Sequence, residues 1–208
     1  MFDWFNAPAF HLFGAPTSWG ELLGFVTGLW TVWLTVRQHI ANWPIGIANV
    51  LLLLAVFWSA GLYGDASLQV VYVVLGFYGW WQWRYGGSGR SARHVRNTTT
   101  QEWVGQACAG VVLVGLLWFF LGRYTDSTVP FADAVTTSLS LLATFGQSRK
   151  LIENWWLWIA ADLVYIPLYG YKHLWLTAIL YVVFAVLCVV GLREWSVAHR
   201  RTREAVAA

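Results

Sequence analysis

Seven stretches of mostly apolar residues constrain the fold of this chain more than any other feature. A helix needs about 20 such residues to cross the hydrocarbon layer of a membrane, with a usual range of about 17–25. The stretches lie at approximately 19–36, 43–62, 67–84, 103–122, 130–148, 155–171 and 174–193, with turn residues or charges between them. The sequence therefore predicts an all-α membrane protein with seven transmembrane helices.

The amino-acid composition excludes several other classes of protein. The chain is 58% hydrophobic and only 11% charged, whereas charged residues make up about a quarter of a soluble domain. Its net charge of +3 is small and its basic residues form short clusters between apolar stretches, so we expect no nucleic-acid partner. Cys108 and Cys188 lie inside apolar stretches without disulfide or zinc-site spacing, and we expect neither a metal nor a cofactor.

The distribution of Lys and Arg predicts how the chain is oriented in the membrane. Cytoplasmic loops of membrane proteins carry an excess of these residues. Of the 13 in this chain, Arg123 and Lys172 lie on one side of the predicted helices and the others lie on the opposite side. The others are Arg37, Arg84, Arg90, Arg93, Arg96, Arg149, Lys150, Arg193, Arg200, Arg201 and Arg203. We therefore expect a multi-pass protein of the inner cell membrane, with its N-terminus outside and its C-terminus in the cytoplasm.

The sequence contains an internal repeat. The shift that brings Arg37 onto Arg149, which we call the repeat offset, also aligns Trp43 with Trp155. The same offset, without a gap, gives four further matches: Ile40 with Ile152, Asn42 with Asn154, Gly79 with Gly191 and Trp83 with Trp195. Four predicted helices separate equivalent positions, an even number, so both copies face the same way. Parallel repeats of this kind are typical of transporters that bind substrate near the membrane midplane.

The repeat divides the chain into segments. An N-terminal segment at 1–18, whose aromatic residues suit the membrane interface, precedes a first three-helix repeat at 19–84. A cytoplasmic loop at 85–102, which looks flexible, leads to a linking helix at 103–122. A second three-helix repeat at 130–193 and a basic cytoplasmic tail at 194–208 complete the chain. The alternative is a duplicated structural bundle without a transport pathway.

Asp162 is the residue that most favours a pathway. It lies in the middle of the sixth predicted helix, and its spacing places it on one helix face with Trp155, Trp158, Tyr165 and Tyr169. A carboxylate at that depth costs several kcal/mol and usually faces a cavity or a partner. No Lys, Arg or His occurs at comparable depth in any predicted helix. The partner is therefore a set of hydroxyl and amide donors, as for a structural Asp, or a cation that does not belong to the protein.

Other predicted helices carry polar stripes on one face. Thr137, Ser140, Thr144 and Gln147 share one face of the fifth helix, and such stripes serve helix packing in many membrane proteins. The second and third helices contribute Asn49, Gln69, Tyr72 and Trp80. Aromatic faces attract cations and stack on flat rings, and amides and hydroxyls suit the hydroxyls of a sugar. The expected solute is a flat cationic ring joined to polyol-like groups.

Three motifs carry a resemblance to a known family. They are NWPIG at 42–46, LYGDASLQ at 62–69 and ENWWLWIAAD at 153–162. With the sequence around them they closely resemble the PnuC family of nicotinamide riboside transporters, over about residues 19–196. The resemblance implies a three-plus-one-plus-three (3+1+3) helix fold like that of the SWEET sugar transporters. It also implies facilitated diffusion of nicotinamide riboside, trapping by a cytoplasmic kinase and a homotrimer.

The resemblance also implies which side chains bind the substrate. By motif position they are Asn49, Gln69, Tyr72, Trp80, Gln147, Trp155, Trp158, Asp162 and Tyr165. Sister families carry thiamine or riboflavin, and these vitamins are the alternative substrates. An intramembrane enzyme is disfavoured because no predicted helix holds a Ser–His pair, paired carboxylates or a metal cluster. A non-transporting scaffold is a further alternative, and the absence of a G-x-x-x-x-G-K phosphate loop disfavours an ATP-driven pump.

Overall fold

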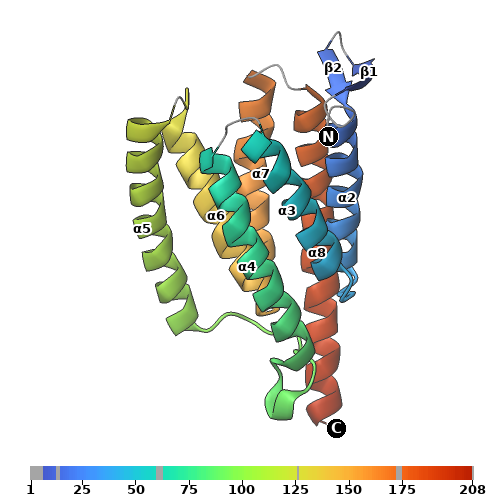
Figure 1. The fold of residues 1–208 in the computed structure, drawn as a ribbon. Coiled ribbons are helices and arrows are strands. Elements are labelled where there is room, and N and C mark those ends of the chain that lie inside the picture. Colours follow the sequence, from blue (N-terminus) through green and yellow to red (C-terminus); the bar gives the residue numbers. More distant parts are fainter. Residues whose placement is uncertain (1–6, 13–14, 60–62, 126, 172–174, 208) are drawn as a thin grey trace.

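The computed structural model describes residues 7–12, 15–59, 63–125, 127–171 and 175–207. Within these ranges the chain forms seven α-helices, one short 3-10 helix and a two-stranded sheet (Figure 1). The helices are α2 (Trp19–Val36), α3 (Asn42–Ser59), α4 (Tyr63–Tyr85), α5 (Thr100–Tyr124), α6 (Pro130–Ser148), α7 (Asn154–Tyr171) and α8 (Trp175–Ala207). Strands β1 (Pro8–Leu12) and β2 (Ala15–Ser18) precede them, and η1 (Ser88–Arg90) lies between α4 and α5.

Each apolar stretch of the sequence corresponds to one of these helices. The helices α2 and α6 begin and end at the predicted residues, and most other ends differ by a few positions. The exception is α8, which continues to Ala207, so the segment 194–207 that was expected to be a separate tail extends the last helix. This segment has no Pro or Gly and is rich in Arg, Glu and Ala, which favour helix.

The N-terminal residues depart from the all-helical expectation. Strands β1 and β2 pair antiparallel, with Pro8 opposite Ser18 and Leu12 opposite Ala15. Pro8 and Pro16 lie within these strands. Proline disfavours a helix interior but is tolerated in edge strands, which both strands of a two-stranded sheet are.

Length and hydropathy single out two of the helices as able to cross a membrane. They are Thr100–Tyr124, with a mean hydropathy of 2.1, and Thr177–Ala205, with a mean hydropathy of 2.0. Two shorter apolar segments, Leu22–Val36 and Asn42–Ala55, lie within α2 and α3. The remaining helices carry more polar residues, among them Asp162, which lowers their hydropathy.

The helices pack as two groups of three with α5 at the side (Figure 1). In the first group α3 packs against α2 and α4, and in the second group α7 packs against α6 and α8. The most extensive contacts between the groups are those of α2 with α8 and of α4 with α6. The linking helix α5 packs against α6, and none of its residues is buried.

Positions related by the repeat offset have matching local structure. The ring of Trp43 occupies the place that a Cβ of Gly79 would take, and the ring of Trp155 occupies the corresponding place at Gly191. Only glycine leaves room for these rings. Before α3 and before α7 the backbone also takes the same left-handed turn, at Gln38 with a φ of 54° and at Lys150 with a φ of 51°.

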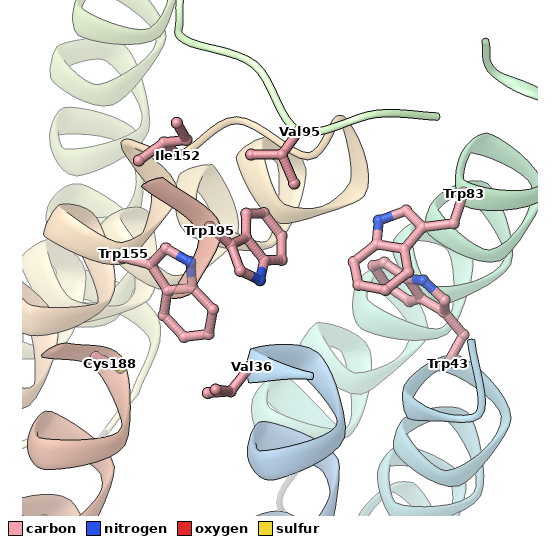
Figure 2. Packing of buried hydrophobic residues seen from close by; sticks show 8 residues of the cluster. All are labelled: Val36, Trp43, Trp83, Val95, Ile152, Trp155, Cys188 and Trp195. Carbon is pink, nitrogen blue, oxygen red and sulfur yellow. The ribbon is translucent and has the colours of Figure 1, made fainter. Parts of the chain in front are cut away.

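A row of four indole rings lies between the two groups, at the end of the bundle where α4 ends and α5 and α7 begin. Its order is Trp43, Trp83, Trp195, Trp155, with successive ring centroids 5.5, 5.9 and 5.3 Å apart. Figure 2 shows the four rings with other members of the same buried cluster. The middle contact, between Trp83 and Trp195, joins the first group of helices to the second.

Residues 93–98 of the connection between α4 and α5 are packed against the bundle, which the expectation of a flexible loop did not include. Val95 is only 6% exposed and belongs to the buried cluster. Arg96 forms a parallel backbone bridge with Leu151 of the α6–α7 turn. A capping box of Thr99 and Glu102 then starts α5.

Candidate functional site

Asp162 lies on the face of α7 that packs against the rest of its group. Its side chain is 2% exposed, and the thiol of Cys188 on α8 donates to Oδ2 at 3.6 Å. A thiol is a weak donor. No ion pair joins Asp162 to a basic side chain in the described part of the chain. The protein therefore supplies little to balance a negative charge at this position.

Three tyrosine rings cluster beside Asp162. Tyr165, one turn along α7, lies 4.5 Å from Tyr181 of α8 and 5.6 Å from Tyr169, measured between ring centroids. Tyr169 and Tyr181 are stacked at 5.2 Å. Tyr181 was not among the residues predicted from the sequence. The spacing of Thr177, Tyr181, Phe184 and Cys188 along α8 was the signal for it, because it places all four on one helix face.

Hydroxyl groups connect this tyrosine cluster to the first group of helices. The side chains of Tyr72 on α4 and Tyr165 on α7 both lie near the Ser140 hydroxyl on α6. Tyr165 also lies near Thr136. The predicted residues Tyr72, Asp162 and Tyr165 are thus brought together. We call Asp162, Cys188, Tyr165, Tyr169, Tyr181, Tyr72 and Ser140 the Asp162 cluster.

At one pair of equivalent positions, the contacts between the two groups of helices differ in polarity. Tyr72 meets Ser140 on one side. At the equivalent positions of the repeat, the ring of Phe184 lies 3.4 Å from where a Cβ of Gly28 would be. Tyr72 and Ser140 therefore place hydroxyls between α4 and α6. Their equivalents, Phe184 and Gly28, place only hydrocarbon between α8 and α2.

The other predicted residues of the first group, on α3 and α4, have different surroundings. Asn49 on α3 donates to Thr27 Oγ1 on α2 at 2.6 Å. Trp80 stacks on Phe77 with ring centroids 6.5 Å apart and packs against the buried cluster. Gln69 on α4 is buried. The buried cluster against which Trp80 packs includes Cys188, whereas no hydrogen bond within the described residues joins Asn49 to the Asp162 cluster.

The two predicted tryptophans of α7 have different surroundings. Trp155 is 1% exposed, and its ring lies against Gly191 and edge-on to Trp195. Its Nε1 is buried without a hydrogen-bond partner among the described residues. Trp158 is half-buried and packs against the same buried cluster. Trp155 is therefore part of the row of indoles, while Trp158 lies one turn nearer to Asp162 on α7.

Gln147, the last of the predicted residues, lies where the two groups of helices meet. Its Nε2 donates to Thr35 Oγ1 at 3.4 Å, and these two positions are themselves related by the repeat offset. Nearby, Lys150 Nζ donates to Gln38 Oε1 at 3.3 Å, again between equivalent positions. Lys150 also lies over the Trp83 ring, 4.5 Å from its centroid. Burial lowers the pKa of Lys150 to about 8.

A separate cavity of about 400 Å³ lies between α5 and the second group of helices. Its lining is mostly apolar and includes Trp103, Gln106, Ser138, Leu142 and Leu157. None of the nine predicted binding residues lines it. The cavity therefore does not belong to the Asp162 cluster.

Comparison with known families identifies the kind of protein. A sequence model of the family described as "Nicotinamide mononucleotide transporter" matches residues 18–197, which is most of the chain. The chain belongs to this family. Its motifs at 42–46, 62–69 and 153–162 all lie inside the matched region.

Individual relatives of the chain are transporters of different vitamins. The chain is 30% identical over 204 residues to the riboflavin/roseoflavin transporter RibM of Streptomyces davaonensis, covering 96% of this chain and 94% of the relative. It is 23% identical over 207 residues to the nicotinamide riboside transporter PnuC of Escherichia coli, covering 88% and 87%. The crystal structure of the vitamin B3 transporter PnuC matches with a TM-score of 0.70 and 25% identity, covering 88% of this chain and 83% of that one.

These comparisons confirm the resemblance to the PnuC family that the three motifs indicated. The matched relatives are transporters and not enzymes, so this chain is a membrane transporter. A small-molecule vitamin as substrate fits the family.

Proposed function

We propose that this protein takes up nicotinamide riboside across the inner cell membrane by facilitated diffusion and so supplies a precursor of NAD. The observation that carries the proposal is the burial of Asp162 beside a tyrosine cluster without a protein cation within the described residues. A cationic solute would provide the charge that this carboxylate lacks.

The chemistry of nicotinamide riboside suits the Asp162 cluster. Its pyridinium ring carries a fixed positive charge, and cation–π contact with an aromatic face is worth about 0.5–2 kcal/mol. Tyr165 and Trp158 are the aromatic groups of α7 within one turn of Asp162. The hydroxyls of Tyr72 and Ser140 suit the ribose, since they both donate and accept hydrogen bonds.

Riboflavin is the second candidate, and the similarity to RibM favours it. The isoalloxazine ring is flat and uncharged, and the ribityl chain offers several hydroxyls. The tyrosine cluster and the hydroxyls of the α4–α6 side suit these groups equally well. The charge of Asp162 is what separates the candidates, because only the pyridinium ring gains from it.

The proposal includes a particular arrangement in the membrane. Helices α2–α4 and α6–α8 are two parallel repeats joined by α5, in a 3+1+3 architecture like that of the SWEET transporters. The matching structure at positions related by the repeat offset supports this arrangement. All seven helices cross the membrane, with the N-terminus outside and the end that carries Arg93, Arg96 and Arg149 in the cytoplasm. We call this the basic end.

The proposed partners follow from the same resemblance. The protein forms a homo-oligomer, by resemblance a trimer, and a cytoplasmic kinase traps the substrate by phosphorylating it. A non-transporting scaffold is disfavoured because the matched relatives are transporters.

Uptake into vesicles that contain only the purified protein tests the proposal. Labelled nicotinamide riboside should equilibrate across the vesicle membrane, with unlabelled nicotinamide riboside competing better than riboflavin or thiamine. Stronger competition by riboflavin would identify the second candidate as the substrate. Sustained accumulation under a proton or sodium gradient would contradict facilitated diffusion.

A further inference from the structure

The segment of residues 91–98 crosses the basic end of the bundle and contacts both groups of helices. It follows a tight turn after α4, in which Gly87 has no room for a Cβ because Ala92 O would lie 2.7 Å from it. The chain then returns toward the bundle instead of leaving it (Figure 1). We call residues 91–98 the strap.

Arg93 attaches the strap to α4 in the first group. Its backbone N donates to Trp83 O at 3.2 Å. Its Nη1 donates to Gly86 O at 3.1 Å and also to the side-chain oxygen of Gln82. The strap follows α4 in the chain after one tight turn. These bonds therefore make the strap an extension of the first group of helices.

The turn between α6 and α7 holds the other side of the strap. Arg93 Nε donates to Arg149 O at 2.9 Å. The backbone N of Arg96 donates to Lys150 O at 3.1 Å, and the backbone N of Ile152 donates back to Arg96 O at 3.0 Å. Arg96 thus extends the backbone of the second group by a short parallel bridge.

Two further contacts join the strap to the residue that precedes α7 and to α8. Both the backbone N and the hydroxyl of Thr98 donate to Glu153 Oε2, at 2.9 and 2.7 Å. A ring nitrogen of His199 on α8, Nδ1, lies 3.1 Å from Val95 O. The Val95 side chain is buried in the cluster that contains Trp83 and Trp195, as Figure 2 shows.

Directly behind the strap, the two groups of helices are held together by crossed hydrogen bonds. Trp83 Nε1 donates to Gln147 O at 2.9 Å, and Trp195 Nε1 donates to Thr35 O at 3.1 Å. The contact between Lys150 and Gln38 adds to these bonds. A solute could therefore pass between the two groups at this end of the described structure only if Trp83 and Trp195 separated. That separation also pulls on the strap, because Arg93 is bonded to both sides.

We propose that the strap holds the basic end closed, and that its detachment from the α6–α7 turn is a step of every transport cycle. This inference rests on the proposed transport function. The strap stays on α4 through Arg93 and leaves the turn by breaking the bridge between Arg96 and Leu151. The solute then passes between Trp83 and Trp195 as the two groups of helices move apart.

A reversible disulfide across the bridge tests the strap. Residues 96 and 151 are paired, and neighbouring paired backbones lie about 4.8 Å apart, which is within the roughly 4.4–6.8 Å that a disulfide spans. We would combine Arg96→Cys and Leu151→Cys with Cys108→Ala and leave the buried Cys188 in place. The two variants that carry only one of the new cysteines, in the same background, are the matched controls.

The oxidised double variant should transport no faster than protein-free vesicles, and reduction should restore uptake. Both single variants should transport whether or not they have been oxidised. Transport by the oxidised double variant at the reduced rate would overturn the role of the strap. If the wild-type protein itself carries neither nicotinamide riboside nor riboflavin, the proposed function fails instead, so the two failures can be distinguished.

A second measurement needs no substitution. Lys150 and Lys172 are the lysines of the chain, and Lys150 is buried behind the strap with a pKa lowered to about 8. At pH 8 about half of its amine is unprotonated and reacts once a reagent reaches it. We expect an amine-reactive label to modify Lys150 slowly, and several-fold faster when nicotinamide riboside or riboflavin is present. Lys172 serves as the internal control, and an unchanged rate at Lys150 with a transported solute would contradict the proposal.

Discussion

Trp83 and Trp195 contact each other across the two groups of helices, with ring centroids 5.9 Å apart. Each indole donates a hydrogen bond to a backbone oxygen of the opposite group, Trp83 to Gln147 and Trp195 to Thr35. The two donors are equivalent positions of the repeat, and so are the two acceptors. A duplicated sequence has therefore produced a symmetric closure, and most of the following predictions concern this closure or the Asp162 cluster.

Replacing Asp162 by Asn should weaken binding of a cationic solute selectively. The change retains the shape but removes the charge, and loss of one member of a buried charge pair costs about 2–5 kcal/mol, or roughly 30-fold or more in affinity. Binding of nicotinamide riboside and of its reduced, uncharged form would be measured in both proteins. An equal loss for both ligands, or no loss, would show that Asp162 has only a structural role.

Replacing Trp195 by Phe should lower the stability of the protein. The change keeps an aromatic ring in the row but removes the bond to Thr35 O, and an unpaired buried polar group costs about 1–3 kcal/mol. Thermal unfolding in detergent would measure the difference. Trp156→Phe is the control, because that side chain is 57% exposed and its loss should matter little.

Replacing Gly191 by Ala should also be destabilising. The new Cβ would overlap the Trp155 ring, which must move, and such overpacking costs about 1–3 kcal/mol. Gly115→Ala on α5 has open space around it and should be neutral or slightly stabilising. Equal unfolding temperatures for the two variants would contradict the close contact between α7 and α8.

Lys150 should make the stability depend on pH in the alkaline range. Burial lowers the pKa of its amine from 10.5 to about 8, so between these values the unfolded chain binds more protons than the folded protein. The free energy of unfolding therefore rises with pH from about 8 to about 10.5, and the burial cost is fully present below pH 8. Replacing Lys150 by Met should remove this rise, as denaturant titrations at several pH values would measure. A rise of the same size in the variant would assign the effect to another group.

Cysteine labelling on intact cells should place the basic end in the cytoplasm. Ser88 and Thr128 are exposed and lie in connections at opposite ends of the bundle. In a Cys108→Ala background, a membrane-impermeant thiol reagent should label Thr128→Cys but not Ser88→Cys. The reverse pattern would invert the proposed orientation, and labelling of both after cell lysis shows that both sites react.

The sequence alone predicted the number of helices in the described ranges and placed most of their ends within a few residues. Membrane thickness sets the length of an apolar stretch, and residues such as Pro44, Pro130 and the charges near 149–153 mark its limits. The match of Asn42, Trp43, Gly79 and Trp83 to their equivalents in the second copy indicated which places would share a structure. The helix face with Asp162 and Tyr165 followed from spacing, since residues three or four apart lie side by side on a helix.

The tertiary structure alone decided which of these residues face one another. Spacing treats Trp155 and Trp158 as one stripe, but the rotation of α7 against Gly191 buries Trp155 in the row of indoles. The strap was expected to be a flexible loop because its sequence is polar, yet it bonds to the α6–α7 turn, which is distant in the sequence. Pairing between such distant segments depends on how the helices pack in three dimensions, which local sequence patterns do not specify.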